Sequence, residues 1–182
     1  MDVAKVYPYV VPAGYVEHAG ANPSGFILPL GHEVYAVLFH DFDGISRNVF
    51  MEELTESGLA PAEAHARALD NLESLASGPD IQKSMHQGPG GLPFELWSGH
   101  WLTASCIRLP GLFAFATKFL KAEAVCVSIP QREAMLLFPF GTHEQREQMR
   151  VLIYEKEADA RKLVTWELFT LSSTGLQPLV ES

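Results

Sequence analysis

The sequence predicts an α+β fold, in which a mainly antiparallel sheet has two to three helices packed on it. Three observations predict this class: β-prone runs dominate the chain, two pairs of runs are joined by tight hairpin-like connections, and single helices stand between them. The chain has 182 residues, of which 47% are hydrophobic and 19% charged. We therefore expect one globular α+β domain over residues 1–182, with residues 1–29 as an extended N-terminal arm or edge strand.

A strand and a hairpin are expected in the first 50 residues. Residues 6–11 predict an edge strand, because Pro8 and Pro12 cannot donate backbone hydrogen bonds to a neighbouring strand. Residues 14–25 predict a loop. The alternating run over residues 33–41 predicts a strand, and Asp43 with Gly44 predicts a hairpin turn into residues 45–50, because glycine adopts the positive φ that such turns need.

Two helices have strong local signals. Residues 60–76 predict a helix with Pro61 in its first turn, where the missing N–H costs least. Residues 142–157 predict a second helix, since Thr142 and Gln145 fit a capping box. The predicted apolar stripe of the first helix consists of Ala62, Ala66, Leu69, Leu72 and Ala76.

The remaining elements are assigned from composition. A third helix is expected over residues 110–122. Strands are expected at residues 81–87, one or two within 92–106, a central one at 124–129, its hairpin partner at 134–138, and a last one at 162–171.

The negative charge of the chain is confined to one half. The formal net charge is −9. The first 100 residues hold 4 basic and 13 acidic side chains, whereas the remaining 82 hold 9 of each. Nine of the acids lie between residues 41 and 80, against Arg47 and Arg67. This balance disfavours binding to nucleic acids and to anionic membranes, which need a basic surface.

Cysteine usage and hydropathy indicate a cytoplasmic protein. Cys106 and Cys126 form no CxxC pair, so a reduced chain is the simpler interpretation. The N-terminus has no basic segment followed by an apolar one, as a signal peptide would. No apolar run approaches the roughly 18 residues of a membrane span.

Candidate catalytic residues follow from side-chain chemistry alone. Ser105 or Cys106 is a candidate nucleophile, with His86 or His100 as its base, which would make the chain a small hydrolase or transferase. No metal-binding motif is present among the seven histidines, and the glycines at 88–91 lack the Lys and Ser/Thr of a phosphate-binding loop. The sequence therefore implies no metal and no cofactor.

Three ordered stretches resemble the YtpQ-like family of bacterial proteins of unknown function. They are residues 30–43, a strand entering an acidic turn; residues 59–72, a helix ending Ala-x-x-Asn-Leu; and residues 125–137, a strand followed by Pro-x-Arg. Ser105 before an apolar segment fits the same order. The resemblance implies a soluble α+β domain. It implies no established activity, so no catalytic residue is carried over.

The residues behind this resemblance have physical interpretations of their own. Asn71 would cap backbone groups or bind a neighbouring strand, and Arg132 would pair with Asp41 or Asp43. If these four residues converge, they would instead line a polar ligand pocket.

Our leading hypothesis is a non-catalytic cytosolic protein-binding module, such as an adaptor or an immunity-like protein. Its acidic segment, residues 41–80, would dock a basic protein partner. A further hypothesis is a homodimer formed through residues 112–119 or 134–140. The candidate binding residues are Asp41, Asp43, Glu52, Glu53, Glu56, Asn71 and Arg132.

Overall fold

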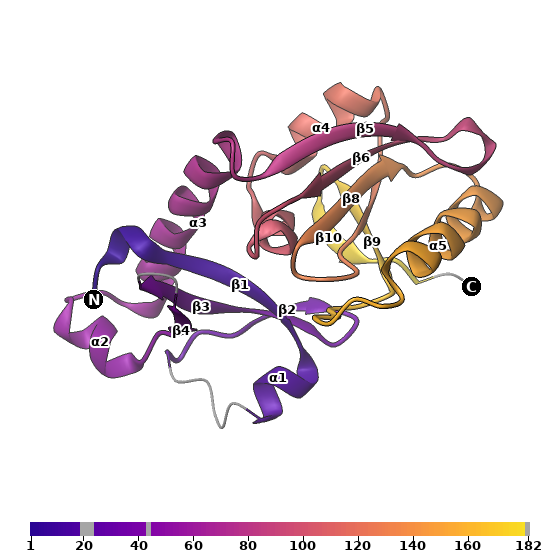
Figure 1. Ribbon diagram of the computed structural model, residues 1–182. Helices are drawn as coiled ribbons and strands as arrows, with labels where there is room; N and C mark the ends of the chain where they lie inside the picture. The colour runs from indigo at the N-terminus through magenta and orange to yellow at the C-terminus, as the bar shows by residue number, and fades with distance from the viewer. Residues whose placement is uncertain (19–23, 43–44, 181–182) are drawn as a thin grey trace.

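The computed structural model describes residues 1–18, 24–42 and 45–180 (Figure 1). Its strands are all paired antiparallel and form two sheets, which confirms the predicted α+β class. The first sheet has the order β1-β3-β2, with β4 also paired to β3. The second has the order β10-β9-β7-β8-β6-β5, with β7 in its interior as predicted for residues 124–129. The sequence pattern had not separated the two sheets.

The strands of the first sheet are β1 (Val6–Pro12), β2 (Leu28–Gly31), β3 (Val34–Phe42) and β4 (Ile45–Asn48). Those of the second are β5 (Gln82–Gln87), β6 (Pro93–Ser98), β7 (Val125–Ser128), β8 (Ala134–Pro139), β9 (Leu168–Ser172) and β10 (Gly175–Pro178). The α-helices are α1 (Ala13–His18), α2 (Met51–Glu56), α3 (Pro61–Ser77), α4 (Leu112–Leu120) and α5 (His143–Glu157). Short 3₁₀ turns are η1 (Val3–Lys5), η2 (Pro89–Gly91) and η3 (Thr103–Arg108).

The first sheet follows the sequence prediction closely at β1, β3 and β4. β1 is an edge strand, which accommodates Pro8 and Pro12. β3 and β4 pair antiparallel with Phe42 opposite Ile45, as a hairpin requires. The turn residues Asp43 and Gly44 lie outside the described residues. The segment predicted as a loop contains α1, and β2 was not predicted.

The helix α3 covers one face of the first sheet. Pro61 occupies its first turn, as predicted. The buried residues of α3 are Ala64, Ala68, Leu72 and Ala76, so the predicted stripe was right at Leu72 and Ala76 and wrong at Ala62 and Ala66, which are exposed. Small alanine side chains let the helix approach the sheet closely, and Ala64 and Ala68 pack in one cluster with Leu38 of β3.

The second sheet lies between two layers of apolar side chains. The helix α5 lies against one face (Figure 1), where Met149 and Ile153 pack with Cys126 and Phe138. The predicted capping box of α5 is present, since Thr142 Oγ1 accepts from the Gln145 N–H at 3.2 Å and the Gln145 side chain accepts from the Thr142 N–H. A larger cluster on the other face contains residues of both sheets, with Val10 and Ala36 from the first and Val127, Leu137 and Phe169 from the second. The two sheets therefore share one core.

Three parts of the second half differ from expectation. Residues 92–106 form one strand, β6, and the 3₁₀ turn η3. Of residues 162–171, only the last four are in a named strand, β9. The hairpin partner of that strand, β10, was not predicted.

Candidate functional site

Within the predicted acidic segment, some carboxylates are exposed without an ion pair among the described residues, and others bind groups of the protein itself. Glu52 and Glu56 are exposed on α2, and neither makes an ion pair among the described residues. Asp41 lies half-buried near the end of β3, and Asp43 lies outside the described residues. The carboxylates of Glu52 and Glu56 are therefore available to a partner.

Glu53 has a structural role instead. Both of its carboxylate oxygens accept from the Arg47 guanidinium, at 2.7 and 2.6 Å, and one also accepts from the Phe50 backbone N–H at 3.1 Å. The hydrogen bonds from Arg47 are the main reason that the pKa of Glu53 is lowered to about 2. This carboxylate joins β4 to the first turn of α2.

Large apolar side chains are exposed beside these acids. The exposed fractions are 56% for Phe42, 69% for Ile45, 46% for Phe50 and 39% for Met51. Phe42 and Ile45 are cross-strand partners, and Arg47, two residues further along the same face of β4, lies with its guanidinium 5.9 Å from the centre of the Phe50 ring. Met51 follows at the start of α2. We call Phe42, Ile45, Phe50, Met51, Glu52 and Glu56 together the acidic–apolar surface.

Of the four residues of the predicted polar pocket, Asp43 lies outside the described residues, and Asn71 and Arg132 bind different partners. The Asn71 side-chain amide donates to the carbonyls of Val3 and Val6, at 2.9 and 2.8 Å, so Asn71 binds a neighbouring segment, which is one of its two predicted roles. Arg132 pairs with the adjacent Glu133 at 3.0 Å. Within the described parts of the chain, no hydrogen bond or ion pair joins Arg132 to Asp41 or to Asn71.

The candidate nucleophiles are buried in η3. The Ser105 hydroxyl oxygen accepts from the Val10 N–H at 3.2 Å and so joins η3 to β1. The Cys106 side chain is buried, and burial is the main reason that the pKa of its thiol is raised to about 12. A thiol with so high a pKa is almost entirely protonated at neutral pH, which is unfavourable for nucleophilic attack.

The two candidate bases, His100 and His86, form hydrogen bonds with groups other than Ser105 and Cys106. His100 Nδ1 accepts from the Leu102 N–H at 3.2 Å, and burial lowers the pKa of this imidazole. His86 lies on the exposed strand β5, where it shares a 2.8 Å hydrogen bond with the Ser84 hydroxyl. Among the described residues no histidine contacts Ser105 or Cys106 through a hydrogen bond, so neither nucleophile has a base in contact.

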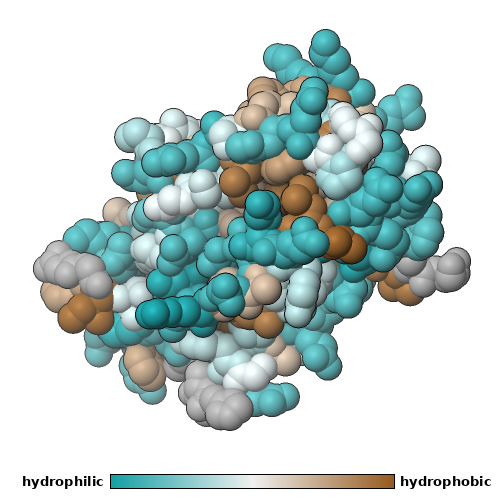
Figure 2. All heavy atoms as spheres, turned by 45° about the vertical axis from the view of Figure 1, so that its right-hand side comes forward, coloured by the Kyte–Doolittle hydropathy of each residue, from teal (hydrophilic) through white to brown (hydrophobic). Residues whose placement is uncertain are grey.

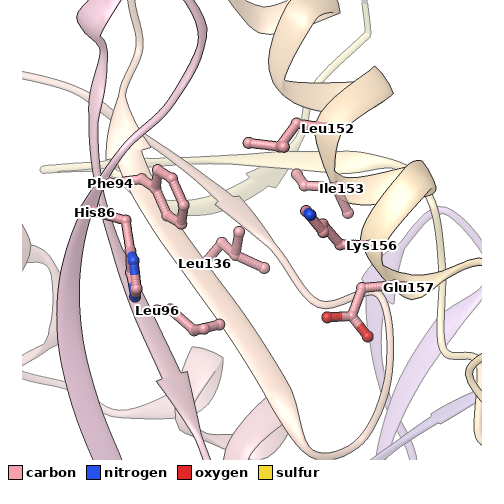
Figure 3. A pocket seen from close by; sticks show the side chains of 8 residues that line it. All are labelled: His86, Phe94, Leu96, Leu136, Leu152, Ile153, Lys156 and Glu157. Carbon is pink, nitrogen blue, oxygen red and sulfur yellow. The ribbon is translucent and has the colours of Figure 1, made fainter.

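His86 lies at an open apolar groove. The groove has a volume of about 380 Å³ and lies between β5, β6, β8 and the C-terminal half of α5. Figure 3 shows Phe94, Leu96 and Leu136 between His86 on one side and Lys156 on the other, with the Glu157 carboxylate at one end. Figure 2 shows apolar side chains in a hollow surrounded by hydrophilic ones. Such a groove can hold a small apolar group.

The surfaces predicted for dimerisation differ in exposure. Ala134, Met135, Leu136, Leu137 and Phe138 are buried in β8 and are not available to a second copy. Phe115 and Phe119 of α4 are exposed by 37% and 44%, and their rings stack with centroids 5.6 Å apart. The α4 surface is therefore the accessible one of the two.

The described residues contain neither a metal-binding cluster nor a membrane-spanning helix. In the part of the chain that the structure describes, no three His, Cys, Asp or Glu side chains are grouped so as to hold a metal ion. No described helix is both long and apolar enough to cross a bilayer.

Comparisons with known proteins add no functional information. No protein-family model matches the chain, and no curated protein or solved structure is significantly similar to it. The YtpQ-like resemblance thus stays a prediction, and the function has to be argued from the geometry of this structure.

Proposed function

We propose that this chain is a non-catalytic protein-binding module that docks a basic partner on the acidic–apolar surface. One observation carries the proposal: four large apolar side chains are exposed on the β3–β4 hairpin and at the start of α2, the helix that carries Glu52 and Glu56, and these two glutamates have no ion-pair partner among the described residues. Contiguous exposed apolar residues with a charged rim are typical of protein interfaces. The partner would bury an apolar anchor on Phe42, Ile45 and Phe50 and place Lys or Arg against the two glutamates.

The charge distribution supports a basic partner. Because the excess of negative charge lies in the first 100 residues, a positive partner would be attracted toward this half of the chain before contact. Arg47, the cation beside Phe50, is already neutralised by Glu53. An adaptor or an immunity-like protein acting in the cytoplasm would use a surface of this kind.

A photo-crosslinking experiment tests the location. A benzophenone amino acid is introduced at Ile45, which is 69% exposed, and in a control chain at Val151, which is 57% exposed on α5. We expect one basic protein to be cross-linked from position 45 and not from position 151. Cross-linking of that protein from both positions at equal yield would refute docking at this surface.

Charge reversal tests the electrostatics with the purified partner. The variant Glu52→Lys/Glu56→Lys should weaken binding at least about tenfold, because each reversed charge faces a cation across the interface. Glu123→Lys/Glu155→Lys is the matched control, since both residues are exposed and lie outside the surface. Glu53 is left unchanged because its reversal would disrupt α2 itself. Equal weakening in both variants would sink the proposal.

Self-association through α4 is a second candidate, supported by the exposed Phe115–Phe119 stack. Sedimentation equilibrium over a wide concentration range tests it. A dimer that Phe119→Ser converts to a monomer is expected, and a wild-type chain that is monomeric throughout would exclude it.

A hydrolase using Ser105 or Cys106 gains no support from the geometry, because both side chains are buried without a contacting base.

A further inference from the structure

A second cavity, distinct from the groove and from the acidic–apolar surface, is lined by cations. It has a volume of about 330 Å³, and its lining includes Tyr9 of β1, Tyr15 of α1, Arg132 of the β7–β8 turn, and Arg161 and Lys162 from the segment between α5 and β9. In Figure 1 this segment passes beside the junction of β1 and α1. We call this cavity the cationic pocket.

The cation-bearing segments are held together by backbone hydrogen bonds. The Arg132 N–H donates to the Lys162 carbonyl at 3.2 Å, and the Val164 N–H donates to the Pro130 carbonyl at 2.9 Å. Between them, Gln131 and Leu163 form an antiparallel β-bridge. Although thirty residues apart in sequence, Arg132 and Lys162 therefore have their backbones held side by side by the fold.

The charge in this pocket is largely uncompensated. Arg161 and Lys162 make no ion pair among the described residues, and Arg132 pairs only with its exposed neighbour Glu133. By contrast, Arg47 is neutralised by Glu53 and Arg67 by Glu63. A local surplus of positive charge in a chain of net charge −9 indicates an anionic ligand.

The pocket also has an aromatic wall, formed by Tyr9 beside Arg132 and fixed in place by ring contacts. The Tyr9 ring lies 4.4 Å from the Phe39 ring, 5.4 Å from the Trp101 ring and 6.4 Å from the Tyr15 ring, measured between centroids. These contacts hold Tyr9 as a rigid surface against which an apolar or aromatic group can pack. The pocket thus combines a flat apolar wall with a cationic rim.

From this combination we propose that the cationic pocket binds a small organic phosphate monoester, with the phosphate on Arg132, Arg161 and Lys162 and the organic group on Tyr9. A phosphate dianion has more charge to place among three cations than a carboxylate has, and a guanidinium can bind two of its oxygens at once. The volume suits a ligand of small-molecule size. This activity goes beyond the proposed docking function and uses other elements of the fold.

Calorimetric titration of the full chain with phenyl phosphate tests the proposal. We expect saturable binding of phenyl phosphate that is tighter than the binding of inorganic phosphate and of phenol, because only the ester uses both walls. Arg161→Gln/Lys162→Gln should weaken it at least about tenfold, the effect of losing charged hydrogen bonds. Lys118→Gln/Lys121→Asn removes two exposed cations from α4 and its C-terminal cap and should change binding by less than about twofold.

Three outcomes would overturn the proposal. The first is no saturable binding of phenyl phosphate. The second is inorganic phosphate binding as tightly as the ester, which would leave no role for the aromatic wall. The third is equal weakening in both double variants, which would mean non-specific attraction. Glu52→Lys/Glu56→Lys should bind phenyl phosphate normally, so failure of the docking proposal is distinguishable from failure of this one.

Discussion

Replacement of Glu53 by alanine separates the structural glutamate of α2 from the glutamates proposed to bind a partner. The substitution removes the two hydrogen bonds from Arg47 and the one from the Phe50 N–H. Glu52→Ala is the matched control, because Glu52 lies in the same turn and makes no ion pair among the described residues. Glu53→Gln is intermediate, since it removes the charge but keeps an acceptor for the backbone N–H.

The size of the effect follows from these contacts. An exposed ion pair contributes about 0.5–1 kcal/mol after screening by solvent, and a side-chain acceptor at a helix N-terminus contributes about 1 kcal/mol. Glu53→Ala should therefore lower the free energy of unfolding by about 1–2 kcal/mol, and Glu53→Gln by about half of that. For a chain of this length, each kcal/mol corresponds to a fall in melting temperature of about 2–4 °C.

The contribution of Glu53 also depends on pH in a definite direction. Because its folded-state pKa is about 2, below the ordinary value of 4.5, its stabilisation is present above pH 4.5 and is lost as the pH falls through 2. Thermal unfolding of the wild type and the three variants, followed by circular dichroism at pH 7 and at pH 2–3, measures both effects. The reasoning is refuted if Glu53→Ala is no less stable than Glu52→Ala, or if the difference between wild type and Glu53→Gln does not shrink in acid.

Four other outcomes are expected. The pKa of His65 is lowered to about 4, mainly by burial, so stability should fall by about 1–3 kcal/mol as the pH drops from 6.5 to 4; His65→Gln should flatten this dependence in urea titrations. Asn71→Ala should destabilise the chain by about 2 kcal/mol in the same assay, because two backbone carbonyls lose their donor. Cys106 should resist iodoacetamide at pH 8 until urea unfolds the chain, and mass spectrometry of its peptide would detect early labelling that contradicts this. Leu96→Asp should reduce the fluorescence of an apolar dye bound in the groove, whereas Val151→Asp on the outer face of α5 should not.

The elements that the sequence predicted well are those with local signals. Pro61 and the capping box of Thr142 and Gln145 act within one turn of their own helices, so they mark α3 and α5 without reference to the rest of the fold. The first half of the α3 stripe could not be read in this way, although Leu72 and Ala76 were predicted correctly. Alanines occur on several sides of that helix, and only the contact with β1 and β3 decides that Ala64 and Ala68, not Ala62 and Ala66, face inward.

The elements that the sequence missed depend on distant partners. β2 and β10 have four residues each, and they are strands only because β3 and β9 are beside them. The six residues of α2 are too few to show a periodic pattern, and the helix is held instead by Glu53 and the buried Leu54. Such segments carry little signal of their own.

The prediction of functional sites from the sequence likewise succeeded where the signal was local and failed where it depended on the fold. Residue counting was enough to place the acids of the docking proposal between residues 41 and 80. It could not reveal that Phe42 and Ile45 are exposed, because apolar residues in a β-prone run are expected in the core. The cationic pocket could not be predicted from the sequence for another reason. Arg132 and Lys162 are far apart in the chain, and only the backbone bridge between the β7–β8 turn and the segment after α5 brings them together.

The two proposed sites together explain why the charge is divided along the chain. The acidic–apolar surface belongs to the first 100 residues, whereas Arg132, Arg161 and Lys162 belong to the electrically neutral remainder. The proposed basic partner would be attracted by the first set and repelled by the second, so the same division that would guide it to α2 would keep it away from the cationic pocket. An anionic ligand would be repelled by the acidic–apolar surface and attracted by the cationic pocket. The two sites can then be occupied at once, each protected from the other's ligand by charge alone, and this selectivity should weaken as salt screens the charges.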